Sequence, residues 1–246
     1  MDQDLFRTAA GDPVTAVTAA EMTEVDRVAV EEFGLGIVQM MEHAGRTLSR
    51  IASESDPDRI TVVAGGGGNG GGGLACARHL AARDRLHRVV LDRSPATYQG
   101  APATQLRLLE RMDIELVDAA ATPDGSETDA ITDADRIIDA LIGYGLTGAP
   151  GGIAAELIAA MESASAPVTA LDIPSGVDAT TGEAAGAVVT PETTVTLAVP
   201  KTGLLPLDHR LVCADLGIPA SVYEAVGIEY THPFGDQFSV DLSRAE

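Results

Sequence analysis

The sequence predicts an α/β fold: a doubly wound, mostly parallel sheet with helices on both faces, in a Rossmann-like three-layer sandwich. Short apolar segments rich in β-branched residues alternate with segments of helical composition. The apolar segments are continuous rather than alternating, which is typical of parallel strands covered on both faces. The chain has 246 residues, 45% of them hydrophobic, and no repeat or linker divides it. We therefore expect one domain over residues 17–232, with a loosely ordered arm at 1–16 and a tail at 233–246.

Two helices are predicted to precede the sheet. The stretch from Thr18 to Glu21 fits a capping box, which starts a helix that continues to about Phe33. Glycines then break this helix, and a second one follows. The expected order in this part of the chain is a helix at 37–52, a strand at 60–64, a glycine loop at 65–73 and a helix at 74–82.

The alternation of strands and helices continues to the end of the predicted domain. An acidic, polar stretch at 118–134 is expected to be a surface excursion. A second glycine loop is expected at 143–148, and a tight turn after residue 173. The remaining strands are predicted at 87–91, 114–117, 136–142, 167–173, 193–199 and 211–214, and the remaining helices at 105–112, 153–163 and 220–225.

The charge of the chain excludes whole classes of partner. The net charge is −21, from 37 acidic and 16 basic residues. Such a surface repels nucleic acid and anionic membranes. Lys201 is the one lysine in the sequence. Extreme acidity with a single lysine suits a cytoplasm of very high salt, so we predict a halophilic source; an ordinary acidic protein is the alternative.

The remaining composition predicts a cytoplasmic protein. No apolar run approaches the roughly 20 residues of a membrane span, and the N-terminus lacks the basic region of a signal peptide. The two cysteines, Cys76 and Cys213, are too few for a disulfide framework and form no zinc motif.

The run of eight glycines around Asn69, at residues 65–73, predicts a binding site for an anionic ligand. A strand, a glycine loop and a helix in this order present bare backbone N–H groups and a helix N-terminus. The run satisfies the dinucleotide fingerprint, and Asp92 ends the next strand, where a ribose-binding acid is expected. A match within eight glycines is weak by itself, and a flexible linker is the alternative. The loop has no lysine, which excludes a Walker A motif.

Three charged residues at strand ends are further candidates. Asp139 ends an apolar strand, which makes it a candidate acid, base or metal ligand, or else a cap on the next turn. Asp172 precedes Ser175 in a Pro-Ser-Gly turn that could bind ribose and a hard cation, or serve the turn alone. Lys201 is a candidate for an ionic or phosphate contact; the alternative is that a lysine occurs at this position by chance.

These segments together resemble the YjeF N-terminal family, the NAD(P)H-hydrate epimerases, over about residues 15–230. The resemblance rests on the order of its motifs. They are Met41-Glu42-His43-Ala44-Gly45, the glycine run 65–73, Ala77-Arg78-His79-Leu80, Ile138 to Leu146, Asp172-Ile173-Pro174-Ser175-Gly176, Val199 to Leu204, and Asp215-Leu216-Gly217-Ile218-Pro219.

The resemblance implies an isomerase that interconverts the R and S epimers of hydrated NADH and NADPH in metabolite repair. A separate or fused ATP- or ADP-dependent dehydratase would accept one epimer, and a homodimer is a family expectation. Asp139 would transfer the proton, and K⁺ would be bound by Asn69, Asp139 and Ser175. The implied substrate contacts are Gly68, Asn69, Gly70, Gly71, Gly72, Gly143, Tyr144, Gly145, Leu146, Thr147, Gly148, Ala149 and Asp172.

The sequence departs from the family pattern at three positions. The first Asn of the family loop is Gly68 here, its Asp is Gly72, and the Asn of the helix motif is His43. Losing that carboxylate removes an acceptor from the expected site. A nucleotide-binding or regulatory relative without activity is therefore one alternative, and a conventional NAD-dependent oxidoreductase is another.

Overall fold

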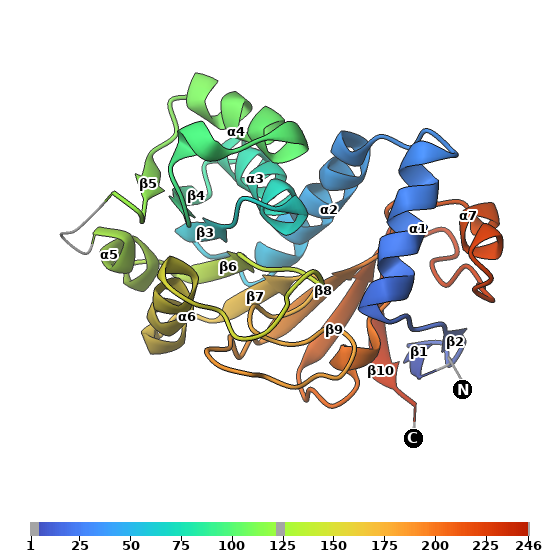
Figure 1. Ribbon diagram of the computed structural model, residues 1–246. Helices are drawn as coiled ribbons and strands as arrows, with labels where there is room; N and C mark the ends of the chain where they lie inside the picture. Colours follow the sequence, from blue (N-terminus) through green and yellow to red (C-terminus); the bar gives the residue numbers. More distant parts are fainter. Residues whose placement is uncertain (1–4, 122–125, 246) are drawn as a thin grey trace.

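The computed structural model describes residues 5–121 and 126–245, which form one ten-stranded sheet with helices on both faces (Figure 1). The order of the strands is β2-β1-β10-β9-β8-β7-β6-β3-β4-β5. The strands are β1 (Phe6–Thr8), β2 (Pro13–Val14), β3 (Ile60–Ala64), β4 (Leu86–Leu91), β5 (Leu116–Asp118), β6 (Arg136–Ala140), β7 (Val168–Leu171), β8 (Thr193–Leu197), β9 (Arg210–Ala214) and β10 (Ser239–Arg244). The helices are α1 (Ala19–Glu31), α2 (Ile37–Ala52), α3 (Gly68–Ala81), α4 (Gly100–Arg111), α5 (Ser126–Thr132), α6 (Ile153–Ser163) and α7 (Ala220–Ala225).

The strand order confirms the predicted doubly wound fold. Strands β3 to β9 pair in parallel, and β10, β1 and β2 pair antiparallel at one edge. From β3 the chain moves outward through β4 and β5, then returns to β6 on the other side of β3. The strand order therefore reverses between β3 and β6. Sheets of this type bind ligands at such a reversal, beyond the carboxyl ends of the strands.

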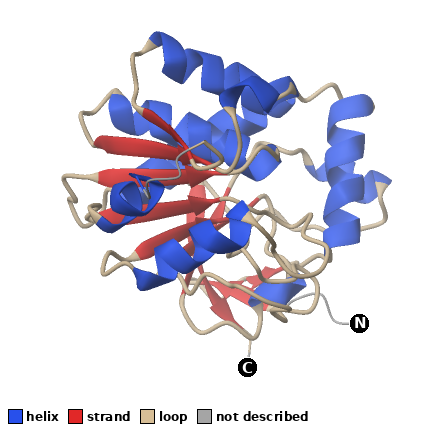
Figure 2. Cartoon of the chain, turned by 60° about the vertical axis from the view of Figure 1, so that its left-hand side comes forward, coloured by secondary structure: helices blue, strands red, loops and turns tan. Residues whose placement is uncertain are grey.

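Helices lie against both faces of the sheet (Figure 2), and apolar residues on both faces hold them in place. Val62 on β3 belongs to the cluster that packs α2, α3 and α4, through residues such as Leu74. Val63, its neighbour, points to the opposite face and packs with Ile131 of α5 and Leu157 of α6. Successive side chains of a strand point to opposite faces, so a continuous apolar strand can hold both layers. Of the helices that the structure describes, none has the length and apolar character needed to cross a bilayer.

Local sequence signals set the ends of the first two helices. The Thr18 side chain accepts a hydrogen bond from the Glu21 N–H, and the Glu21 side chain accepts from the Thr18 N–H. This reciprocal pair is the predicted capping box at the start of α1. Helix α2 has the predicted bounds, and its apolar side packs on α3 and β8.

The glycine run differs from the prediction, because most of it is helix rather than loop. Helix α3 begins at Gly68, six residues before the predicted start. Glycine is a poor helix former, so tertiary packing must compensate. A Cβ on Gly70 would lie 1.7 Å from the Gly65 carbonyl oxygen, and one on Gly45 of α2 would lie 2.6 Å from the Cys76 nitrogen. Bare backbone thus lets α3 approach the end of β3 and helix α2 closely.

The Gly70→Ala variant is expected to lose about 3 kcal/mol or more of unfolding free energy, because its Cβ meets a backbone oxygen that cannot rotate away. Gly68→Ala is the matched control. A Cβ on Gly68 meets nothing within 4 Å. That variant is expected to gain about 0.5–1 kcal/mol from the higher helix propensity of Ala. Denaturant unfolding of both variants measures the difference; equal stabilities would contradict the close-approach explanation.

Both ends of the chain and one internal segment also differ from the prediction. The predicted arm contains β1 and β2, and the predicted tail contains β10, which pairs with both β1 and β9. β1 and β10 pair with each other across more than 200 residues of sequence, and β2 pairs with β1 at the edge of the sheet, so local composition did not indicate these strands. The predicted excursion at 118–134 contains α5, whose Ala130 and Ile131 are buried. Residues 1–4, 122–125 and 246 lie outside the described residues.

Candidate active site

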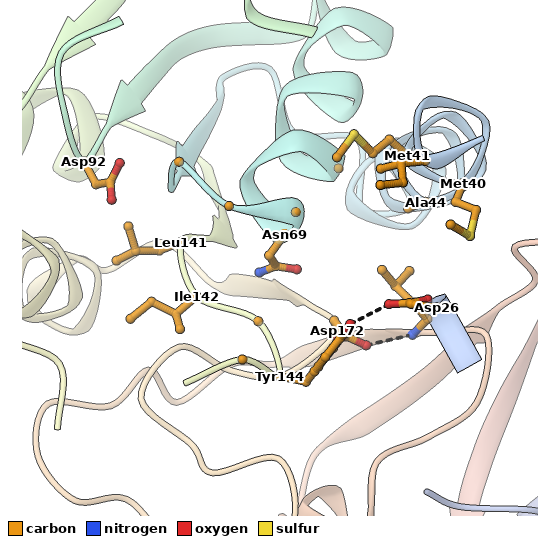
Figure 3. Close-up of a pocket in the computed structure, with 18 of the residues that line it drawn as sticks. Asp26, Met40, Met41, Ala44, Asn69, Asp92, Leu141, Ile142, Tyr144 and Asp172 are labelled. Carbon is orange, nitrogen blue, oxygen red and sulfur yellow. Dashed lines mark hydrogen bonds between the residues drawn. The ribbon is translucent and has the colours of Figure 1, made fainter. Parts of the chain in front are cut away.

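A cavity of about 540 Å³ lies at the reversal of strand order (Figure 3). Its walls come from α1, α2, the start of α3 and the segments that follow β4, β6 and β7. The residues that line it are Asp26, Ile37, Met40, Met41, Ala44, Gly66, Gly67, Gly68, Asn69, Gly72, Asp92, Arg93, Leu141, Ile142, Gly143, Tyr144, Gly145, Ala154, Asp172, Leu197 and Leu216. Its charged lining residues are the carboxylates Asp26, Asp92 and Asp172 and the cation Arg93, so acidic side chains predominate.

Asp139 and Ser175 connect the ends of β6 and β7 beneath this cavity. The Ser175 hydroxyl donates to Asp139 Oδ1 at 2.6 Å, and the Ser175 N–H donates to Oδ2 at 2.8 Å. The Leu141 N–H also donates to Oδ1. Both residues are completely buried, and neither is among the residues that line the cavity.

Burial raises the pKa of Asp139 to about 6, and the hydrogen bonds from Ser175 and Leu141 only partly offset that shift. Removing a carboxylate from water disfavours its charged form. Asp139 therefore changes charge close to neutral pH. The chain uses a buried acid here rather than an apolar residue, which points to a role beyond packing.

Asp139 is expected to make stability depend on pH in K⁺-free buffer. Its pKa of about 6 in the native state exceeds the value near 3.9 of an unfolded Asp. The native state thus binds more protons between about pH 4 and pH 6, so stability is greatest below this window and falls as pH rises through it. Relative to Asp139→Asn, the wild type is expected to lose about 3 kcal/mol across the window. Denaturant unfolding of both proteins from pH 4 to 7 tests this; parallel pH profiles would contradict it.

Asn69 supplies an unsatisfied polar group in the lining of the cavity. Its amide oxygen and nitrogen are both enclosed and have no hydrogen-bond partner among the described residues. Buried amides without partners are rare in native proteins. Asn69 lies on the first turn of α3, faces the cavity and packs against Gly143 (Figure 3). Amide, carboxylate and hydroxyl oxygens are hard ligands, so Asn69, Asp139 and Ser175 fit an alkali or alkaline-earth cation.

Asp172 and Lys201 form a buried ion pair in the cavity wall. Lys201 Nζ donates to Asp172 Oδ1 at 2.5 Å and to the carbonyl oxygens of Leu197 and Val199. The side chains are 4% and 1% exposed. All three Lys201 protons are thereby used, so this lysine binds Asp172 rather than a phosphate. The Asp172 hydrogen bonds from Lys201, Leu197 and Thr196 all reach Oδ1, which leaves Oδ2 for a ligand.

The backbone of Asp172 supports a functional role for this residue. Its φ is +67°, in the left-handed region that residues other than glycine rarely adopt. Such strain costs about 1–3 kcal/mol and persists where the surroundings impose it, often in binding sites. The strained turn directs the carboxylate from the end of β7 into the cavity.

Asp26 and Tyr144 form a hydrogen-bonded pair at the cavity, which the sequence did not indicate. The Tyr144 hydroxyl donates to Asp26 Oδ2 at 2.5 Å (Figure 3). Burial raises the pKa values of both groups. Asp26 is one of many acids on an amphipathic helix, so no local signal distinguishes it. Only the packing of α1 across the loop after β6 shows that it faces the cavity.

The structure brings about half of the predicted contacts to the cavity. Those that line it are Gly68, Asn69, Gly72, Gly143, Tyr144, Gly145 and Asp172. Gly70 and Gly71 are buried in the body of α3, and Leu146, Thr147, Gly148 and Ala149 are not among the lining residues. Helix α2 contributes apolar lining residues, including Met40 and Met41, that were not predicted to belong to the site.

The two glycines that depart from the family pattern differ in the space around them. A Cβ on Gly72 would lie 2.9 Å from Leu171 Cδ2, so a carboxylate there would require Leu171 to move. A Cβ on Gly68 would meet no atom within 4 Å. The Leu171 side chain thus fills the space beside Gly72, whereas the space beside Gly68 is open.

The strand reversal, the glycine-rich helix start and the acidic cavity define an α/β protein of the nucleotide-binding class. The family model for the YjeF-related protein N-terminus matches residues 38–203. The chain belongs to this family.

Three relatives illustrate the similarity. The chain is 42% identical to the NAD(P)H-hydrate epimerase of Dehalogenimonas lykanthroporepellens, over 98% of each chain. It is 36% identical to the bifunctional NAD(P)H-hydrate repair enzyme Nnr of Moorella thermoacetica over 82% of this chain but 40% of that enzyme. The crystal structure of yeast ynu0, YNL200c, has the same fold, with a TM-score of 0.79 at 20% identity, covering 93% of this chain and 100% of that one.

Proposed function

We propose that the chain is an NAD(P)H-hydrate epimerase, which interconverts the R and S epimers of hydrated NADH and NADPH. The observation that carries this proposal is the cavity carboxylate of Asp172, with one oxygen available, in a chain 42% identical to an enzyme of that name. The start of α3 supports it. Unpaired first-turn N–H groups and the helix dipole stabilise an anionic pyrophosphate.

The reaction requires inversion at the carbon that carries the added hydroxyl. The carbon–oxygen bond breaks as the departing oxygen takes a proton, the ring nitrogen stabilises the resulting cation, and water adds to the other face with loss of a proton. Solvent water supplies the first proton, and an ionised carboxylate can accept the second as a general base. Asp172 is placed for this role, because its carboxylate faces the cavity.

The location of Asp139 changes the role that we propose for it. The sequence predicted Asp139 as the proton-transfer group, but the structure encloses it beneath the cavity lining. We therefore assign it to the cation site with Asn69 and Ser175. K⁺ bound there would supply positive charge near the anionic ligand and give the Asn69 oxygen the partner that it lacks among the described residues.

The partners and the cellular setting stay predictions. A dehydratase would act on the epimer that this chain supplies, as the relatives named bifunctional repair enzymes suggest. A homodimer, a cytoplasmic location and a high-salt source are further expectations. They motivate assays in concentrated KCl rather than dilute buffer.

The test is epimerisation of purified R-NADHX, the hydrated form of NADH, in multimolar KCl with the spontaneous rate subtracted. The expected result is a rate well above the spontaneous one, which falls when NaCl replaces KCl at equal concentration. Nucleotide binding without acceleration by the folded protein would favour the binding-only relative. Reduction of a carbonyl substrate by NADH would favour an oxidoreductase.

A further inference from the structure

The end of β4 forms a wall of the cavity that the proposed reaction does not use. Asp92 and Arg93 follow this strand, and both line the cavity. The Asp92 N–H donates to the Ala64 carbonyl oxygen at 3.3 Å, which attaches this wall to the end of β3. Arg93 Nε donates to Asp92 Oδ1 at 2.9 Å, and Nη2 donates to Oδ2 at 2.7 Å. The pair is therefore bidentate and held next to the glycine-rich segment.

Arg93 retains hydrogen-bonding capacity toward the cavity. A guanidinium has five N–H donors, and the two bonds to Asp92 leave three. Its side chain is 53% exposed, whereas that of Asp92 is 10% exposed. The hydrogen bonds that Arg93 donates to Asp92 raise the Arg93 pKa further, so the group is always charged. The guanidinium also lies over Gly66, where an added Cβ would be 2.7 Å from Nε.

Arg93 is the one cationic side chain among the described residues that line this cavity. The other charged lining residues are Asp26, Asp92 and Asp172. Lys201 lies behind the wall, with all its donors used by Asp172 and two carbonyl groups. A dianionic phosphate in the cavity away from α3 would thus find its one favourable side-chain partner at Arg93.

The position of this pair in the fold indicates which part of a dinucleotide it meets. In doubly wound sheets, the strand after the glycine-rich turn ends beside the adenosine ribose. An acid there binds the 2′-hydroxyl, and an arginine accommodates a 2′-phosphate. Here β4 is that strand, and it carries both groups in sequence. We propose that Arg93 binds the 2′-phosphate of hydrated NADPH and that Asp92 binds the free 2′-hydroxyl of hydrated NADH, so that this pair sets the preference between the two substrates.

This assignment rests on the proposed function, so its test uses a binding measurement as well as catalysis. The probes are adenosine 2′,5′-bisphosphate and 5′-AMP, which differ in the 2′-phosphate alone. The variants are Arg93→Gln and Asp92→Asn, with Arg107→Gln on the exposed face of α4 as the control for a lost charge. Calorimetry at constant KCl gives the affinities, and thermal unfolding verifies that each variant is folded.

Arg93→Gln is expected to lower the affinity for the bisphosphate by about 10-fold or more, because a charge-assisted contact is lost. Its affinity for 5′-AMP should stay within about twofold of the wild-type value. Asp92→Asn is expected to weaken binding of 5′-AMP more than binding of the bisphosphate, since it replaces the charged acceptor for the hydroxyl with a weaker neutral one and removes a charge that repels the phosphate. In the epimerase assay, Arg93→Gln should raise KM for hydrated NADPH and leave kcat, and both constants for hydrated NADH, nearly unchanged.

Two results would overturn the assignment. Equal losses of affinity for both probes in Arg93→Gln would show that Arg93 only holds the cavity wall in its structure. An unchanged bisphosphate affinity would show that the 2′-phosphate lies elsewhere. Neither result affects epimerisation by the wild type. Absence of both nucleotide binding and epimerisation in the wild type is a separate outcome, and it would overturn the proposed function together with this inference.

Discussion

Replacing Asp172 by Asn is expected to lower the epimerisation rate by about 10²–10⁴-fold, the usual contribution of a positioned acid or base. The change keeps the shape of the side chain but removes its ability to exchange a proton. The Asn oxygen can still accept from Lys201 and from the Leu197 N–H, as Asp172 Oδ1 does now. The loss should therefore appear in kcat more than in KM. Rate measurements in concentrated KCl with R-NADHX test it.

Two further variants distinguish a proton-transfer role of Asp172 from one of Asp139. Asp178→Asn changes a partly exposed carboxylate of the same turn region, which accepts hydrogen bonds from Thr180 and Thr181 of the described residues, and it should retain wild-type activity. Asp139→Asn should raise the K⁺ concentration needed for activity and approach the wild-type rate at saturating K⁺. If Asp139→Asn is inactive at every K⁺ concentration and Asp172→Asn is active, the proton-transfer role belongs to Asp139, as the sequence alone predicted.

The Lys201→Met variant is expected to lose about 3–5 kcal/mol of unfolding free energy, because it leaves Asp172 as an uncompensated buried charge. Lys201 is 1% exposed and makes three hydrogen bonds to the groups around it. In a domain of this size the loss corresponds to a fall in Tm of about 10 °C. Thermal and denaturant unfolding both measure it, and concentrated salt should not remove it, since buried charges are poorly screened.

Two companions separate the charge effect from loss of packing. In Lys201→Met/Asp172→Asn no buried charge is left unpaired, so this double variant should recover part of the lost stability. Lys201→Arg should stay destabilised, because the compact ammonium group fits between Asp172, Leu197 and Val199 and a planar guanidinium needs more space. A fully stable Lys201→Arg variant would contradict this explanation of why the chain keeps a lysine at this position.

Local patterns were sufficient to predict the elements whose causes are local. The capping box at Thr18 and the glycine break before α2 lie within a few residues of the helices that they define, and α6 and α7 have the predicted bounds. The continuous apolar strands predicted a sheet covered on both faces. Since parallel strands end at one edge, the same reasoning brought the glycine run, the loop after β6 and Asp172 to one site.

Other features were decided by contacts between distant parts of the chain. The start of α3 at Gly68 goes against helix propensity and depends on Gly65, Met41 and Ala140 being close. The strands β1, β2 and β10 exist because each has a partner in the sheet. No local period reports the contacts with Met41 and Ala140 or the β1–β10 pairing, because these groups lie far away in sequence.

The chemistry of the site divides in the same way. The sequence by itself determined which residue types lie at the carboxyl edge of the sheet, because local composition indicates where strands end and turns begin. Only the tertiary structure decided which carboxylate faces the cavity. It buried Asp139 on Ser175, paired Asp172 with the single lysine and brought Asp26 of α1 against Tyr144. Burial and pairing are properties of the packed chain, and they set the charge and reach of each group.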